Sequence, residues 1–192
     1  MRRKSQPSVI LLLLILVFIA LLLLVRTRQA AKFHSGRPSS GESSASAARL
    51  GPPDVYPDPL QTPGVTDPDI TQDNIQDNIC NPAWSTRSIR PPLHYTDELK
   101  REQIRVYGYD DTNPRDYEED HLIPLELGGN PTDPRNLWPE PYVASIPGGD
   151  AHSKDRVERY LHRQVCSGEL PLQQAQREIA TDWYHVYARM AP

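Results

Sequence analysis

The stretch DYEEDHLIPLELGGNPTDPRNLWPEP, residues 116–141, holds the densest set of chemically active side chains in the chain. Three carboxylates lead directly into His121, and an apolar run, a Gly-Gly pair and the triplet Asn-Leu-Trp follow. Short runs bounded by glycine and proline predict two strands, at residues 117–123 and 135–138, joined by a loop at the Gly-Gly pair. We therefore expect a β-hairpin with a histidine in its first strand.

Helical patterns flank this hairpin on both sides. Before it, we expect a short helix that starts at Thr71 and a longer one for which Thr96 is a good N-cap residue. After it, Asp150 is expected to cap a third helix, and residues 172–189 have the apolar spacing of a fourth. The order helix, helix, hairpin, helix, helix predicts an α+β domain.

The N-terminal third of the chain has a different composition. After a basic tail, residues 1–8, comes an unbroken run of 17 apolar residues at 9–25. A helix of that length spans about 25 Å, near the lower limit for a bilayer core. We expect an uncleaved transmembrane signal anchor here, with a cleaved signal peptide as the alternative. Residues 26–68 are rich in Ser, Gly and Pro and are expected to form a disordered tether, so the folded domain is expected at 69–192.

The short basic tail and the large C-terminal part favour a single-pass protein with its domain outside the cytoplasm. The domain would then lie in a bacterial periplasm or at the cell surface, or be secreted if the signal is cleaved. Cys80 and Cys166 are the only cysteines and form no CxxC pair, so their spacing does not predict a thiolate zinc site. In an exported domain we expect them to form one disulfide; two buried free thiols are the alternative in a cytoplasmic domain.

The net charge of the chain bears on whether it can bind nucleic acid. The whole chain has a formal net charge of −4, but from residue 51 onward 13 Lys and Arg face 24 Asp and Glu, and 13 − 24 is −11. A nonspecific nucleic-acid binder is normally basic. A nuclease function therefore requires a compensating cation, and a bound divalent metal would offset part of the excess.

The residues around the hairpin form a candidate hydrolytic set. His121 titrates near neutral pH and can accept a proton from water, while the Asp120 carboxylate is a hard ligand for a divalent cation. The Asn136 amide both donates and accepts, so it can tie two loops together. Three further candidate metal ligands lie at the start of the next helix: His152, Asp155 and Glu158. The alternative is a structural histidine in a solvated acidic turn.

The segments EDHLIPLELGG, NLW and AHSKD together resemble the pattern of HNH endonucleases, the ββα-metal nucleases, over residues 117–158. The resemblance implies a small core made of a hairpin and a helix, with further helices around it. It also implies that His121 is the general base, Asp120 a metal ligand, Asn136 the residue that holds the hairpin loops, and His152 the second ligand. The resemblance also implies one bound divalent ion. We expect Mg²⁺, with Zn²⁺, Mn²⁺ or Ni²⁺ as alternatives.

The chain departs from the HNH pattern in two respects. It has none of the zinc-binding CxxC pairs that many members carry, and a disulfide could provide that link instead. In addition, a helical projection puts His152 opposite the expected apolar seam of its helix, so Asp155 or Glu158 could be the ligand. That seam consists of Val157, Leu161 and Val165.

These observations predict a membrane-tethered or secreted HNH-like endonuclease that hydrolyses phosphodiester bonds of nucleic acid, DNA rather than RNA. The alternative is a non-catalytic domain of the cell envelope that uses the same scaffold for binding or structure. Metal binding separates the two, because the second function does not require an ion.

Overall fold

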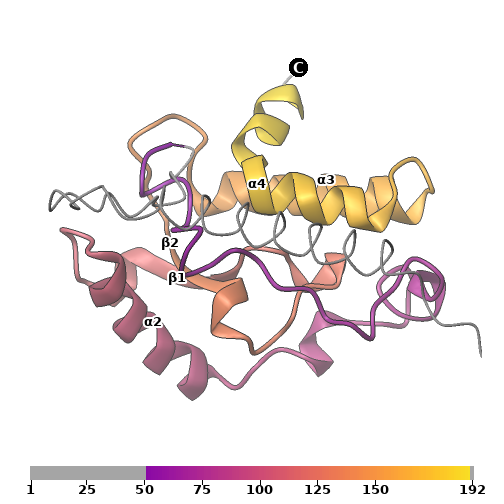
Figure 1. Ribbon diagram of the computed structural model, residues 1–192, viewed down its shortest axis with the longest axis horizontal. Coiled ribbons are helices and arrows are strands. Elements are labelled where there is room, and N and C mark those ends of the chain that lie inside the picture. Colours follow the sequence, from indigo (N-terminus) through magenta and orange to yellow (C-terminus); the bar gives the residue numbers. More distant parts are fainter. Residues whose placement is uncertain (1–50, 191–192) are drawn as a thin grey trace, which may run out of the picture. The chain divides into compact units, whose positions relative to one another are not determined.

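The computed structural model describes residues 51–190 (Figure 1). The expected basic tail, the apolar run at 9–25 and the first part of the tether lie outside the described residues. Within residues 51–190, no helix is both long enough and apolar enough to cross a membrane.

The described part of the chain contains three α-helices and one two-stranded antiparallel sheet. In chain order these elements are α2 (Leu93–Tyr107), β1 (Tyr117–His121), β2 (Leu137–Pro141), α3 (Ala151–Cys166) and α4 (Leu172–Met190). The α+β class expected from the sequence is therefore confirmed for this part of the chain. In Figure 1, α3 and α4 run side by side on one side of the hairpin, and α2 lies on the other side.

The hairpin forms where it was predicted, but β1 ends two residues earlier than expected, and β2 begins two residues and ends three residues later. β1 ends at His121, and β2 extends to Pro141, so that Glu118 lies opposite Glu140. The sequence PEP was expected to be a loop because proline cannot donate a backbone hydrogen bond. Here the Tyr142 N–H points at β1 and donates to the Asp116 carbonyl. The backbone N–H groups of successive strand residues point to opposite edges of the strand. Pro139 and Pro141 therefore lack an N–H only on the outer edge of β2, which has no partner strand in the described sheet.

Two helix boundaries differ from the predictions. α2 begins at Leu93, directly after the extended Pro92, and Thr96 lies inside the first turn, where its hydroxyl donates to the Leu93 carbonyl. The helix expected from Thr71 is reduced to one 3₁₀ turn, Ile75–Asp77. Side chains of neighbouring asparagines bond to backbone groups there, which competes with helix formation. The predicted Asp150 cap of α3 is confirmed, since its carboxylate accepts from the Ser153 N–H.

The main core lies between α3 and α4 and is fully shielded from solvent. It joins the predicted seam of α3 to the inward face of α4: Val157, Leu161, Val165, Ala175, Ile179, Trp183 and Val186. Burial of aliphatic side chains at this spacing stabilises each helix by packing rather than by propensity alone.

Residues 51–68 belong to this packed unit, so the predicted domain start at residue 69 is too late. Val55 has no exposed surface, and its carbonyl accepts from the Trp183 indole at 2.9 Å. The buried Thr62 hydroxyl donates to the Leu137 carbonyl at 3.0 Å. A proline-rich composition excludes regular secondary structure here, but a few well-placed side chains are sufficient to anchor the segment.

Cys80 and Cys166 form the predicted disulfide, with 5.3 Å between their Cα atoms. It links the segment before α2 to the last turn of α3 across 86 residues of sequence. In the chain-entropy model a loop of that length contributes about 4–5 kcal/mol to stability.

Candidate functional site

A pocket of about 370 Å³ lies along the outer edge of β1, between the first half of α2 and the middle of α3. Four of the residues singled out in the sequence line it: Asp120, His121, Asp155 and Glu158. Two basic side chains, Arg90 and Lys100, line it as well. Residues from two helices and a strand thus surround one cavity.

His121 is the last residue of β1 and is 5% exposed. Its Nε2 lies 3.0 Å from the Pro131 carbonyl oxygen, which can only accept, so Nε2 carries the proton and donates. Burial lowers the pKa of His121 below its usual value, although the Asp120 carboxylate acts in the opposite direction. The imidazole is therefore neutral at pH 7, with a basic lone pair on Nδ1.

Asn136 lies behind the pocket, fully buried, and holds the hairpin loop closed. Its Oδ1 accepts from the Ile123 N–H, and its Nδ2 donates to the carbonyls of Ile123 and Asn130, all at 3.0 Å. The carbonyl that orients His121 belongs to the residue after Asn130. The loop tolerates only glycine at Gly129, since an added Cβ would lie 1.7 Å from the Ile123 carbonyl oxygen.

Three carboxylates gather on the face of the hairpin that points to α3. Glu118 and Asp120 alternate along β1, Glu140 lies opposite Glu118 on β2, and their oxygens lie within 4.8 Å of one another. Glu140 is 1% exposed, and neither of its oxygens accepts a bond from a donor among the described residues. Its carboxyl is close enough to Asp120 to share a proton with it. Such buried oxygens require either a proton or a cation.

Lys154 supplies one cation to this group from the first turns of α3. Its side chain has no exposed surface, and Nζ donates to the carboxylates of Asp120 and Glu158 at 2.5 Å and to the His121 carbonyl at 2.9 Å. The ammonium therefore joins α3 to the end of β1 and fixes the two residues that were expected to act together.

One ammonium does not neutralise the four carboxylates around it. Burial raises the pKa of Glu118 to about 7 and that of Glu158 to about 8, and it also raises the pKa of Glu140 well above its usual value. Burial also acts to raise the pKa of Asp120, but the Lys154 ammonium outweighs it and holds this pKa below the usual range. A set of oxygen ligands with excess negative charge fits a hard divalent cation such as Mg²⁺ or Mn²⁺.

The structure does not bring His152 to the pocket. The residue is exposed near the start of α3, and its ring packs against the Tyr142 ring at a centroid distance of 6.1 Å. Because α3 already runs at this position, the side chain points away from the carboxylates. The α3 residues that line the pocket are instead Asp155 and Glu158.

Sequence reasoning missed Glu118, Glu140 and Lys154. Lys154 did leave a signal, because it precedes Val157 by three residues and so continues the apolar seam with a charged side chain. A lysine in such a seam is buried only when it is paired. The two glutamates left no comparable signal, since they come together only through the strand register.

Comparison with known proteins finds no matching family model, no similar curated protein and no similar solved structure.

Proposed function

We propose that this domain is a metal-dependent endonuclease of the HNH type, which hydrolyses phosphodiester bonds in nucleic acid and acts on DNA in preference to RNA. One observation carries the proposal. A neutral histidine, oriented by a loop carbonyl, ends β1, and Glu118 and Asp120 of β1 form with Glu140 of β2 a group of oxygens suited to a metal ion. Asp155 and Glu158 of α3 line the same pocket as His121 and Asp120. A hairpin followed by a helix around one ion is the ββα-metal arrangement that the sequence pattern suggested.

In this mechanism His121 Nδ1 takes a proton from the attacking water, while Nε2 keeps its bond to the Pro131 carbonyl. Glu118, Asp120 and Glu140 would hold the divalent ion, which would supply positive charge to stabilise the phosphate and the leaving oxygen. Lys154 keeps Asp120 and the His121 carbonyl in place. Its role is to position these groups and not to react.

The pocket lining is mostly acidic, so a phosphate substrate requires the divalent ion. Arg90 and Lys100 line the pocket beside six carboxylates, and the Lys100 ammonium donates to the Tyr117 carbonyl at 3.0 Å. A phosphate in this pocket would meet these two cations besides the bound metal ion. Nonspecific electrostatic attraction remains weak for a net charge of −11 from residue 51 onward, so we expect binding to depend on the divalent ion.

We further propose that the domain acts outside the cytoplasm, anchored by residues 9–25 or secreted after cleavage. The disulfide supports this location, because such bonds persist in oxidising compartments.

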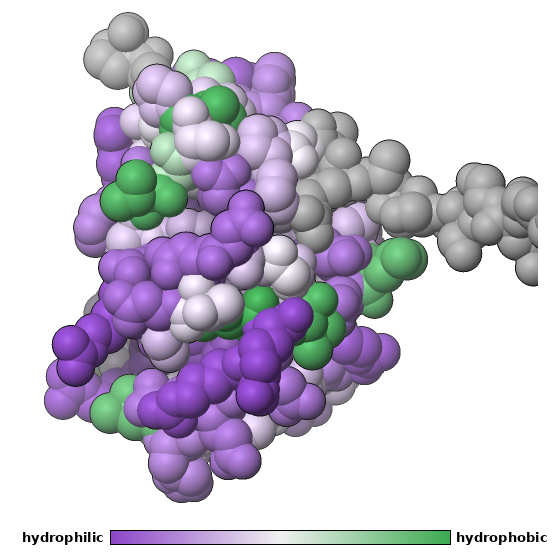
Figure 2. Space-filling view, turned by 90° about the vertical axis from the view of Figure 1, so that its left-hand side faces the viewer, coloured by the Kyte–Doolittle hydropathy of each residue, from purple (hydrophilic) through white to green (hydrophobic). Residues whose placement is uncertain are grey.

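The competing proposal is a non-catalytic envelope domain on the same scaffold. Its support is Lys154, whose ammonium already compensates Asp120 and Glu158 and could serve a purely structural purpose. The face seen in Figure 2 is mostly hydrophilic, with only small separate hydrophobic areas, and so offers no broad apolar surface for a protein partner.

The decisive experiment is the nicking of supercoiled plasmid by the full-length protein with Mg²⁺ or Mn²⁺, with and without a chelator. We expect cleavage that the chelator abolishes. His121→Ala should lower the cleavage rate by at least about 10²-fold, because a general base is lost, while metal affinity stays nearly unchanged. Exposed His185 provides the matched control, and His185→Ala should cleave like the wild type.

Two outcomes would count against the nuclease. Metal binding without cleavage of DNA or RNA would reject the enzyme and leave the envelope domain. Cleavage that survives His121→Ala would reject His121 as the base.

A further inference from the structure

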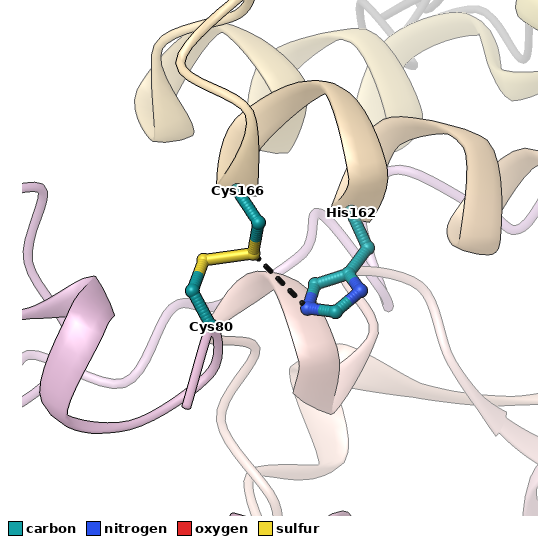
Figure 3. A group of neighbouring side chains, drawn as sticks. All are labelled: Cys80, His162 and Cys166. Carbon is teal, nitrogen blue, oxygen red and sulfur yellow. Dashed lines mark hydrogen bonds between the residues drawn. A yellow bond between two sulfur atoms is a disulfide. The ribbon is translucent and has the colours of Figure 1, made fainter. Parts of the chain in front are cut away.

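A second group of metal-ligating side chains joins the last turns of α3 to the segment before α2. Cys80, His162 and Cys166 place their ligand atoms within 4.8 Å of one another. His162 lies one turn before Cys166 on the helix, and its Nε2 is 3.3 Å from the Cys166 sulfur (Figure 3). The imidazole in Figure 3 points toward the disulfide and not away from it. None of the three residues lines the pocket at β1.

The surroundings of this group leave room for an ion and offer a fourth ligand. The three residues line a hollow of about 450 Å³ together with Glu126, which lies in the turn after β1. Glu126 Oε1 is buried and has no hydrogen-bond partner among the described residues. The three primary ligand residues are half-buried, so an ion can enter from solvent.

We propose that, when the disulfide is reduced, Cys80, Cys166 and His162 bind one Zn²⁺, with Glu126 or water as the fourth ligand. The same two segments, the one before α2 and the end of α3, would then be joined in both redox states. Thiolate and imidazole are the ligands that Zn²⁺ prefers, whereas the carboxylates at β1 suit Mg²⁺, so the chain would carry two sites of different selectivity.

The chemistry balances with a dithiol as the reductant. The dithiol supplies two electrons and two protons, the bond between the Cys80 and Cys166 sulfurs breaks, and the dithiol becomes a disulfide. Zn²⁺ then displaces one proton from each thiol and binds both thiolates. In vitro a phosphine can replace the dithiol; with one water it becomes the phosphine oxide and yields the same two thiols.

The required movements are small. Two thiolates on a tetrahedral zinc lie about 3.8 Å apart, given Zn–S bonds of about 2.3 Å, so the sulfurs separate by less than about 2 Å from their bonded distance. The His162 Nε2 lies 2.7 Å from the Ile79 carbonyl, and it must release this contact to bind an ion. No helix needs to unwind, because His162 and Cys166 already share one face of α3.

The test uses Co²⁺ as a spectroscopic substitute for Zn²⁺ on full-length protein reduced with a phosphine. Thiolate-to-cobalt charge-transfer absorption reports only a site with sulfur ligands, so ion binding at the β1 carboxylates does not interfere. We expect one equivalent of Co²⁺ to produce this band in reduced protein and none in oxidised protein. Zn²⁺ should displace the cobalt, and it should raise the melting temperature of the reduced form.

Variants define the ligands. The double variant Cys80→Ser with Cys166→Ser should lose the charge-transfer band, and His162→Ala should weaken cobalt binding about tenfold or more. His185→Ala, on the exposed side of α4, is the matched histidine control and should bind like the wild type. Absence of the band in reduced protein, whether it is folded or unfolded by circular dichroism, would overturn the proposal. Equal affinity of the His162→Ala and His185→Ala variants would overturn the role of His162.

Discussion

At the scale of single residues, Lys154 determines how the candidate site is held. It is a fully buried cation within 2.5 Å of carboxylates from a strand and from its own helix. An isolated ammonium at such a position would be very costly, so its burial is explained only by the acids around it. Equally, those acids remain buried only because Lys154 is present.

Replacement of this residue should therefore destabilise the fold. We expect Lys154→Met to lower the free energy of unfolding by about 3–5 kcal/mol, because it leaves buried carboxylates without their cation. Arg159 is the matched control, since it lies on the same helix in an exposed pair with Asp155 at 3.8 Å. Arg159→Met should cost less than about 1 kcal/mol. Urea denaturation measures both changes; equal midpoints for the two variants would contradict the assigned role of Lys154.

At the scale of elements, the β1–β2 register creates the acidic face. Glu118 and Glu140 lie 22 positions apart in sequence, and only their direct pairing across the hairpin brings their carboxylates together. The face turned to α3 consequently holds more carboxyl groups than one ammonium can neutralise. This excess makes the stability of the domain depend on both pH and divalent ions.

The sign of the pH dependence follows from the raised pKa values. Burial raises the pKa of Glu118 to about 7 and that of Glu158 to about 8, so the folded state holds protons that the unfolded state has already lost. This contribution to stability is fully present below the unfolded pKa of about 4.5 and is lost as the pH rises through 7 to 8. Without metal, the melting temperature should therefore fall between pH 5 and pH 8.

Divalent ions should reverse that trend. Mg²⁺ or Mn²⁺ competes with protons for the same oxygens, so its affinity should increase with pH, and it should raise the melting temperature more at pH 8 than at pH 6. Calorimetric scans at both pH values, with and without the ion, provide the measurement. A Glu118→Gln variant should show a flatter pH profile. A melting temperature that rises with pH in metal-free protein would contradict this account of the cluster.

At the scale of the whole molecule, the disulfide connects the N-terminal part of the unit to the helix that carries the site. α3 supplies Asp155 and Glu158 to the pocket and, at its end, Cys166 to the disulfide. The segment that contains Cys80 also contributes Ile75 and Ile79 to the main core. Loss of the link should thus affect global stability far more than the local geometry of the pocket.

Removal of the disulfide tests whether global stability can change without a change in the geometry of the pocket. The double variant Cys80→Ser with Cys166→Ser should lose about 4–5 kcal/mol of stability in the chain-entropy model. Below its melting transition, the affinity of the β1 carboxylates for Mn²⁺ should stay within about twofold of the wild type, because the pocket is held by Lys154 and Asn136. Thermal denaturation and titration calorimetry measure the two quantities. A large loss of Mn²⁺ affinity in folded variant protein would show that the two regions are coupled.

Local sequence determined those parts of the protein that depend on neighbouring residues. The Asp150 cap and the Val157, Leu161 and Val165 seam define α3 because helix formation responds to spacing within a few turns. The turn signals of residues 128–131 likewise predict a hairpin. A single pair of cysteines allows only one intramolecular disulfide.

Tertiary structure alone decided the composition of the site. The exact register joined Glu118 to Glu140, the direction of α3 turned His152 to solvent, and packing buried Lys154 among the acids. Packing also brought residues 51–68 into the folded unit, although their composition is that of a tether. These features arise from contacts between residues far apart in the chain, where the energies of burial and pairing outweigh local preference, and no short stretch of sequence contains that information.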